Sequence, residues 1–266
     1  MSYCSPQPPS RVGVSFKNLN VYGEERQDYQ KTVLNVLLDG ATSLFRWIAG
    51  TQRNHVHILD GFHGLVESGE LLLVLGRPGS GCSTFLKAIS GDTYGLLVAD
   101  ESSINYQGMP ALDMRKHFRG EAIYMAETDV HFPQLTVGQT LLFAAKARSP
   151  RKDTLLLVNR QLFAEVMRDV IMATFGLAHT VNTNVGSALV PGVSGGERKR
   201  VSIAEAALSR SPLQCWDNST RGLDSANALE FCRALRTTAD CLKVTALVSL
   251  YQSSEKQYEV STSINP

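Results

Sequence analysis

The feature that most constrains the fold of this 266-residue chain is a glycine-rich turn between a strand pattern and a helix pattern. The apolar run at 71–75 predicts a buried strand over residues 70–75, and residues 83–90 predict a helix. The turn between them reads Gly76, Arg77, Pro78, Gly79, Ser80, Gly81, Cys82, Ser83 and Thr84. Its glycine spacing is that of a phosphate-binding loop, in which backbone N–H groups and the helix dipole converge on phosphate oxygens. A tight strand-to-helix turn without a ligand is the alternative interpretation.

One position of this loop departs from the usual pattern, because Cys82 stands where a lysine is expected. A thiol cannot place a positive charge between terminal phosphates. Losing one charge-assisted hydrogen bond costs about 1.5–3 kcal/mol, or about one to two decades of affinity. A reactive thiol is the alternative, ranked lower because no partner base or second thiol lies nearby in the sequence. Ser83 keeps the hydroxyl that such loops offer to Mg²⁺.

Composition narrows the class of protein. Hydrophobic residues make up 43% and charged residues 19%, which argues against disorder. A net charge of +1 does not give the long-range field of a dedicated nucleic-acid binder, so no nucleic-acid partner is expected. No apolar run approaches the ~18 residues of a membrane span, and residues 1–11 carry no secretion signal. The five cysteines form no C-x-x-C pair, which disfavours a disulfide scaffold or zinc site and favours a reducing, cytosolic setting.

Periodicity predicts an α/β chain. Strands are expected at 14–22, 122–126, 213–217 and 243–250, and helices at 136–148, 159–175, 197–209 and 226–239. An amphipathic helix is also expected at 32–48. From residue 58 onward, the alternation of short apolar runs with helices predicts a parallel sheet covered by helices.

The strand at 213–217 ends in an acid. Asp217 has the position of a carboxylate that ends a strand and binds Mg²⁺. The following residue, where a general base is expected, is Asn218, and an amide can orient water but cannot take its proton. Losing a general base costs ~10²–10⁴ in rate. Taken alone, an Asp after a strand is more often a helix cap.

A second glycine-rich turn precedes a basic helix, more than a hundred residues after the first. It reads Val193, Ser194, Gly195, Gly196 and Glu197, and it forms another anion cradle at a helix N-terminus. A third short segment follows the acidic strand: Gly222, Leu223, Asp224 and Ser225. Taken in chain order, the segments 76–84, 193–197, 213–217 and 222–225 strongly resemble the P-loop, signature loop, Walker B strand and D-loop of ATP-binding-cassette proteins.

The resemblance spans residues 14–259 and implies an ABC-type P-loop NTPase domain. Such a domain has a RecA-like core with a mixed sheet and a helical signature subdomain. It implies ATP and Mg²⁺ as ligands, with the P-loop holding the nucleotide and Ser83 and Asp217 holding the metal. In this family, two such domains face each other, and each signature loop closes over the partner's P-loop.

Two further substitutions point to a branch of the family. Glu127 stands where the Q-loop glutamine is usual, and Tyr251 where the switch histidine is usual. With Cys82 and Asn218, they look like the N-terminal nucleotide-binding domain of fungal pleiotropic-drug-resistance (PDR) exporters of the G class. The P-loop and residues 135–140 also look like that branch.

The resemblance implies an asymmetric mechanism. The chain's own ATP site would hydrolyse slowly or not at all, whereas its intact signature loop would complete the competent site of a partner nucleotide-binding domain. Transmembrane domains of the full transporter are the other implied partner, and hydrophobic drugs or lipids are the implied cargo. The implied location is the cytoplasmic face of a membrane, the plasma membrane in the first place.

The expected organisation has three parts: an N-terminal extension (1–54), a nucleotide-binding domain (55–259, helical subdomain about 136–200) and a divergent tail (260–266). The tail departs from the family where a final strand is expected, so that strand is apparently missing and marginal solubility is expected. A soluble, truncated pseudo-ATPase or regulator in the cytosol is therefore the alternative function. A soluble ATPase of translation or DNA repair is disfavoured, because neither a second cassette nor a long coiled coil is evident. Tyr22 could stack on an adenine ring, although a core role is preferred.

Overall fold

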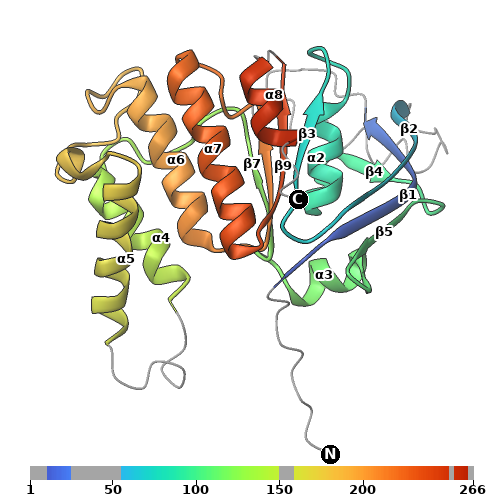
Figure 1. Ribbon diagram of the computed structural model, residues 1–266, viewed down its shortest axis with the longest axis horizontal. Helices are drawn as coiled ribbons and strands as arrows, with labels where there is room; N and C mark the ends of the chain where they lie inside the picture. The colour runs from blue at the N-terminus through green and yellow to red at the C-terminus, as the bar shows by residue number, and fades with distance from the viewer. Residues whose placement is uncertain (1–10, 25–54, 150–158, 252–254, 263–266) are drawn as a thin grey trace, which may run out of the picture.

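The computed structural model describes residues 11–24, 55–149, 159–251 and 255–262. Figure 1 shows a parallel sheet near the middle of the molecule, an antiparallel sheet to one side of it, and a layer of helices to the other. The amphipathic helix expected at 32–48 lies outside the described residues. The elements, in chain order, are β1 (Val14–Glu24), β2 (His55–Val66), β3 (Leu71–Leu75), α2 (Cys82–Ser90), β4 (Leu96–Val98), β5 (Ser103–Tyr106), β6 (Met109–Pro110), α3 (Ala111–His117), β7 (Ala122–Met125), α4 (Val137–Ala147), α5 (Arg160–Thr174), η2 (Ala178–Thr180), α6 (Gly195–Ser209), β8 (Leu213–Asp217), α7 (Ser225–Leu242), β9 (Thr245–Leu250) and α8 (Glu255–Thr262).

The parallel sheet has the strand order β3-β9-β8-β7. Every residue of β8 and β9 is buried, as expected for apolar parallel strands covered on both faces. The four strands confirm the segments expected from the sequence. Because parallel strands all end at one edge, the residues that follow β3, β7, β8 and β9 meet there.

The second sheet is antiparallel, in the order β2-β1-β5-β6, with β4 also paired to β1. The expectation of a parallel sheet from residue 58 onward is therefore wrong for β2, β4, β5 and β6. The long pairing of β2 with β1 runs from Val14↔Val66 to Glu24↔His55 with register shifts, which obscure the alternating pattern of a half-exposed strand. The domain boundary at 54/55 stays a prediction, although β1 precedes it and pairs with β2, which follows it.

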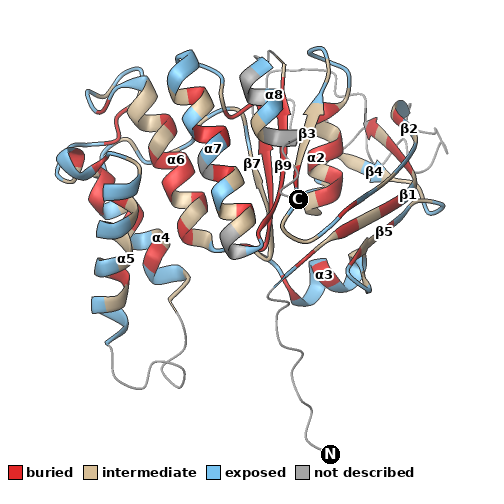
Figure 2. Cartoon of the chain, in the orientation of Figure 1, coloured by how far each residue is buried: buried red, intermediate tan, exposed pale blue. Residues whose placement is uncertain are grey.

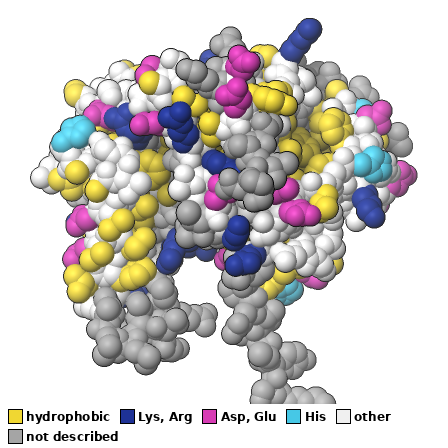
Figure 3. Space-filling model, viewed as in Figure 1, with side chains coloured by type: hydrophobic (Ala, Val, Ile, Leu, Met, Phe, Trp, Pro, Cys, Tyr) yellow, Lys and Arg dark blue, Asp and Glu magenta, His cyan; other side chains and the backbone are white. Residues whose placement is uncertain are grey.

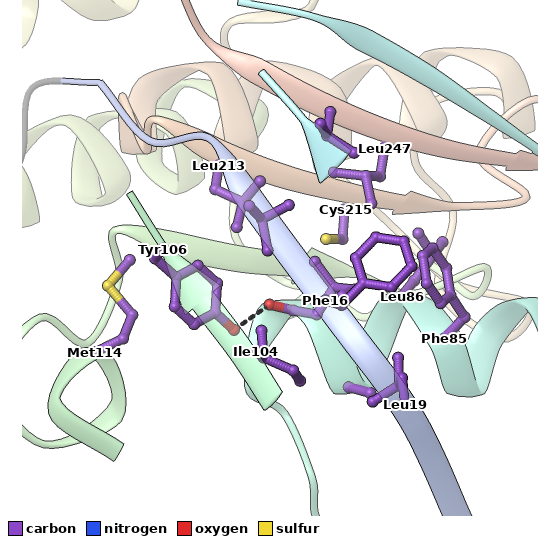
Figure 4. Close-up of a cluster of buried hydrophobic side chains, with 14 of the residues drawn as sticks. Phe16, Leu19, Phe85, Leu86, Ile104, Tyr106, Met114, Leu213, Cys215 and Leu247 are labelled. Atoms are coloured by element: carbon purple, nitrogen blue, oxygen red, sulfur yellow. Dashed lines mark hydrogen bonds between the residues drawn. The ribbon is translucent and has the colours of Figure 1, made fainter. Parts of the chain in front are cut away.

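Helix α2 packs between the two sheets and joins their cores. Its Phe85 ring meets Phe16 of β1 edge-on at 5.2 Å between ring centroids. The same cluster includes Leu213 and Leu247 of the parallel sheet, as Figure 4 shows. Figure 2 shows buried segments along α2, which include Phe85, Leu86 and Ile89. The glycine-rich turn thus precedes a helix that both sheets hold in place.

The helices α4, α5 and α6 share a separate hydrophobic core. Thr136 caps α4 by accepting a hydrogen bond from the Gln139 N–H, as the expected helix at 136–148 requires. Helices α6 and α7 cover the parallel sheet, where Trp216 packs edge-on against Phe231 at 5.3 Å between ring centroids. None of the helices in the described part of the chain combines the length and the hydropathy that a membrane span requires.

Candidate functional site

The turn between β3 and α2 needs its glycines. Gly79 and Gly81 have positive φ angles of 85° and 93°, which side-chain-bearing residues rarely adopt. A Cβ on Gly76 would lie 2.3 Å from Ser80 Oγ and 2.5 Å from Cys82 Sγ. A Cβ on Gly79 would meet nothing within 4 Å, so the backbone there is open to a ligand. The turn therefore has the geometry of an anion-binding loop at a helix N-terminus.

The Cys82 side chain is turned into this loop. It is 7% exposed, and its Sγ lies 3.4 Å from Ser80 Oγ. The thiol therefore supplies no charge to the open side of the loop, and its burial argues against the alternative of a reactive cysteine.

Asp217 ends the buried strand β8 and is 3% exposed. Its Oδ2 accepts a hydrogen bond from the Tyr124 hydroxyl at 2.6 Å, and its Oδ1 accepts one from Ser249 Oγ at 2.7 Å. Burial and the neighbouring Asp217 raise the pKa of Tyr124, so its phenol stays a donor. The helix that follows, α7, has Asp224 at its N-cap position, so the alternative role of Asp217 as a helix cap is excluded.

Ser83, in the first turn of α2, lies beside Tyr251, which directly follows β9. The two hydroxyl oxygens are 3.3 Å apart. Ser83 and Asp217 offer a hydroxyl and a carboxylate, the hard oxygen ligands that Mg²⁺ prefers. Within the described residues, no group of three or more His, Cys, Asp or Glu side chains could hold a metal alone. The Ser83 hydroxyl and the Asp217 carboxylate fit Mg²⁺, which is usually bound through one or two protein ligands together with nucleotide phosphates.

The structure brings two of the substituted positions, Glu127 and Asn218, into direct contact. Asn218 Nδ2 donates to Glu127 Oε1 at 2.9 Å, and Arg221 donates to the same oxygen. The Asn218 backbone has a positive φ of 42°, and its N–H donates to Ser249 Oγ at 2.9 Å. The amide therefore already has a carboxylate partner at the position where a general base is expected.

A buried lysine ties the segment after β7 to helix α6. Lys199 is 4% exposed, and its Nζ donates to the Glu127 carbonyl oxygen at 3.1 Å and lies 3.3 Å from Asp129 Oδ1. Ser202, one turn along α6, donates to the same Asp129 oxygen at 2.6 Å and lies 2.8 Å from His131 Nε2. Burial lowers the pKa of His131, which favours its neutral form.

The second glycine-rich turn starts α6 through a capping box. Ser194 Oγ accepts from the Glu197 N–H, and the Glu197 carboxylate accepts from the Ser194 N–H at 2.8 Å. These bonds and His179 lower the pKa of Glu197 to about 2. A Cβ on Gly195 or Gly196 would meet nothing within 4 Å, so this helix start is also open.

The segment 222–225 lies at the start of α7. Gly222 has a positive φ of 79°, and Asp224, at the N-cap position, accepts a side-chain hydrogen bond from Asn227. In the part of the chain that the structure describes, no hydrogen bond or ion pair joins the turn 193–197 to the loop 76–84.

Tyr22 is half-buried and stacks on His57 of β2, with ring centroids 4.6 Å apart and planes 16° apart. It is not part of the hydrophobic cluster around α2, so the preferred core role is wrong. The next residues of β2, Ile58 and Leu59, lie where a Cβ on Gly81 would contact them at 3.2 and 3.0 Å. The stacked pair therefore lies near the glycine-rich loop.

Sequence reasoning missed several residues of the site: Tyr124, Ser249, Arg221 and Lys199. Tyr124 and Ser249 lie inside strands whose apolar pattern indicates only core packing. Lys199 is one of several basic residues in a helix, and only its burial distinguishes it. The strand order is the signal that could have found Ser249, because Asp217 and Ser249 are directly opposite in register.

Comparison with known proteins agrees with this geometry. A family described as "ABC transporter" matches residues 59–221, and one described as "ABC-transporter N-terminal" matches residues 3–36. The chain is 59% identical over 254 residues to the ABC multidrug transporter atrG of Aspergillus oryzae and 61% identical over 254 residues to the ABC multidrug transporter C of Aspergillus fumigatus. It is 56% identical over 253 residues to the ABC-type transporter oblD of Cochliobolus heterostrophus. Each match covers 95% of this chain but only 17% of the relative.

Proposed function

The chain belongs to the ABC transporter family, and from this premise we propose that it is the N-terminal ATP-binding domain of a PDR-type multidrug efflux transporter. Two of the three relatives reported above are multidrug transporters. The match to this chain spans 17% of the length of each. A second nucleotide-binding domain and transmembrane domains are accordingly the proposed partners, at the cytoplasmic face of a membrane. Hydrophobic drugs or lipids are the proposed cargo.

One observation carries the nucleotide-binding part of the proposal. The open glycine-rich loop with its Ser83 hydroxyl follows β3, the Asp217 carboxylate ends β8, and both strands end at the same edge of the parallel sheet, which supports a common ligand for these groups. Bound ATP would find backbone N–H groups for its phosphates there, and Mg²⁺ would find two oxygen ligands.

The degenerate character of this site rests on Cys82 and Asn218. The buried thiol provides no phosphate-binding charge, and Asn218, bonded to Glu127, provides no base for the attacking water. The open start of α6 at Gly195 and Gly196 supports a separate role, in which it completes the ATP site of the partner domain.

The test is nucleotide binding and turnover by the purified chain. We expect a fluorescent ATP analogue to bind weakly in the presence of Mg²⁺ and to be hydrolysed negligibly. Asp217→Ala, which removes the proposed metal ligand, is expected to weaken Mg²⁺-dependent binding by about 10-fold or more. Turnover that survives purification and disappears in Asp217→Ala would show that the site is competent and would contradict the proposal.

A further inference from the structure

Asp217 is held by one hydroxyl from each neighbouring strand. Strand β8 lies between β7 and β9 in the parallel sheet, and Tyr124 and Ser249 come from these two strands. Each hydroxyl donates to a different carboxylate oxygen, at 2.6 Å for Tyr124 and 2.7 Å for Ser249. The orientation of the carboxylate is therefore fixed on both sides.

The Tyr124 ring is itself held in place. Lys87 of α2 lies over the ring, with its Nζ 5.4 Å from the centroid. Lys87 is one helical turn after Ser83, so the same helix that carries the Ser83 hydroxyl also contacts the tyrosine that positions Asp217. A cation over an aromatic face is attracted to it, and the contact restrains the ring between α2 and β8.

We propose that Tyr124 is a positioning residue for Mg²⁺, which fixes Asp217 Oδ2 so that the carboxylate faces the metal bound with ATP. The inference rests on the proposed function, because it concerns the metal of that nucleotide site. Carboxylates that ligate metals are held by hydrogen bonds from surrounding groups, and losing such a partner typically lowers metal affinity about 10–100-fold. Each carboxylate oxygen keeps a second lone pair, so the Tyr124 bond leaves room for a metal or a metal-bound water.

The purely structural alternative is that Tyr124 only compensates a buried charge. Both roles predict some loss of stability when the hydroxyl is removed, because a buried carboxylate loses a donor. Only the positioning role predicts a loss of metal affinity without a matching loss of metal-free nucleotide affinity. The test must therefore separate metal binding from nucleotide binding and from folding.

The experiment compares the 266-residue chain with its Tyr124→Phe variant, which keeps the ring and removes only the hydroxyl. Affinity for a fluorescent ATP analogue is measured in EDTA, and Mn²⁺ affinity of the ATP complex is measured by electron paramagnetic resonance, with Mn²⁺ in place of Mg²⁺. We expect Mn²⁺ affinity to fall about 10-fold, with metal-free nucleotide affinity changed less than about 2-fold. Ser249→Ala, which removes the opposite hydroxyl, is expected to change Mn²⁺ affinity in the same direction.

Tyr106→Phe is the matched control, because Tyr106 also donates a buried phenol hydroxyl, to the Ile89 carbonyl oxygen, away from Asp217. Thermal unfolding confirms that each variant is folded. An unchanged or increased Mn²⁺ affinity in Tyr124→Phe, or an equal loss in Tyr106→Phe, would overturn the inference alone. Failure of the unmodified chain to bind nucleotide would instead overturn the proposed function, and the inference with it.

Discussion

At the scale of single residues, two of the substituted positions of the site interact with each other. An ATP-binding-cassette site usually has a glutamine in the Q-loop and a glutamate after the Walker B strand. Here the carboxylate is Glu127 and the amide is Asn218, and the two side chains are hydrogen-bonded. The pair still contains one carboxylate and one amide, but the carboxylate is bonded to Asn218 and Arg221 instead of standing free beside the attacking water.

Replacing Cys82 with lysine tests the missing charge. We expect Cys82→Lys to tighten binding of the ATP analogue about 10- to 100-fold, because a charge-assisted hydrogen bond to phosphate is restored. Hydrolysis is expected to stay negligible, since Asn218 remains. Cys82→Ala is the matched control, which removes the thiol without adding charge. Rapid hydrolysis by Cys82→Lys would show that Asn218 does not limit turnover.

At the scale of elements, helix α6 connects the second glycine-rich turn to the segment that follows β7. It begins at the open turn with Ser194, and one turn later its Lys199 holds the segment that contains Glu127. A displacement of that segment would therefore act directly on the helix whose start is proposed to serve the partner site. The contact is buried and charged, so breaking it would leave Asp129 without its cation.

The start of α6 predicts a dependence of stability on pH. The pKa of Glu197 is about 2 in the folded protein against an ordinary value of 4.5, so the unfolded chain binds its proton more readily. The charged carboxylate therefore stabilises the fold above pH 4.5, and this contribution is lost as the pH falls from 4.5 toward about 2. In Glu197→Gln, which keeps a capping residue without the charge, we expect lower stability at neutral pH.

Chemical unfolding of both proteins across this pH range is the measurement. The stability difference between them should shrink as the solution becomes more acidic. A difference that stays constant with pH would show that the charge of Glu197 contributes nothing to the helix start.

At the scale of the whole molecule, one helix presents an apolar face to solvent. Leu162, Val166 and Val170 follow one another at intervals of four residues along α5 and are 53%, 52% and 53% exposed. Figure 3 shows hydrophobic side chains gathered over α5. The opposite face of α5, with Ala164 and Met172, is buried against its neighbours. Contiguous exposed apolar surface of this kind favours association.

Replacing Leu162, Val166 and Val170 together with glutamine is expected to reduce self-association of the purified chain. Stability should change by no more than about 0.5 kcal/mol per site, because exposed substitutions remove little packing. Sedimentation velocity over a range of concentrations measures the effect. Leu189→Gln is the control, since Leu189 is 94% exposed but stands outside this face. Equal self-association of the triple variant and the unmodified chain would exclude the α5 face as its cause.

The sequence by itself determined the parallel core of this protein and the segments that carry its chemistry. Strands of the parallel sheet such as β3 have short apolar runs, and a loop such as 76–81 has a glycine spacing that few other structures require. Both signals are local, because they depend on neighbouring residues and on backbone conformations that only glycine adopts easily. The antiparallel sheet was not predicted, because β2 is largely exposed and register shifts interrupt its alternation of apolar and polar residues.

Only the tertiary structure decided which side chains act together. Asp217 meets Tyr124 from 93 residues away and Ser249 from 32 residues away, and Glu127 meets Asn218 across 91 residues. These contacts follow from strand order, which places β7 and β9 on either side of β8. The energy of a buried carboxylate depends on the donors that surround it in space. Residue spacing along the chain carries no information about those donors until the strands are ordered into a sheet.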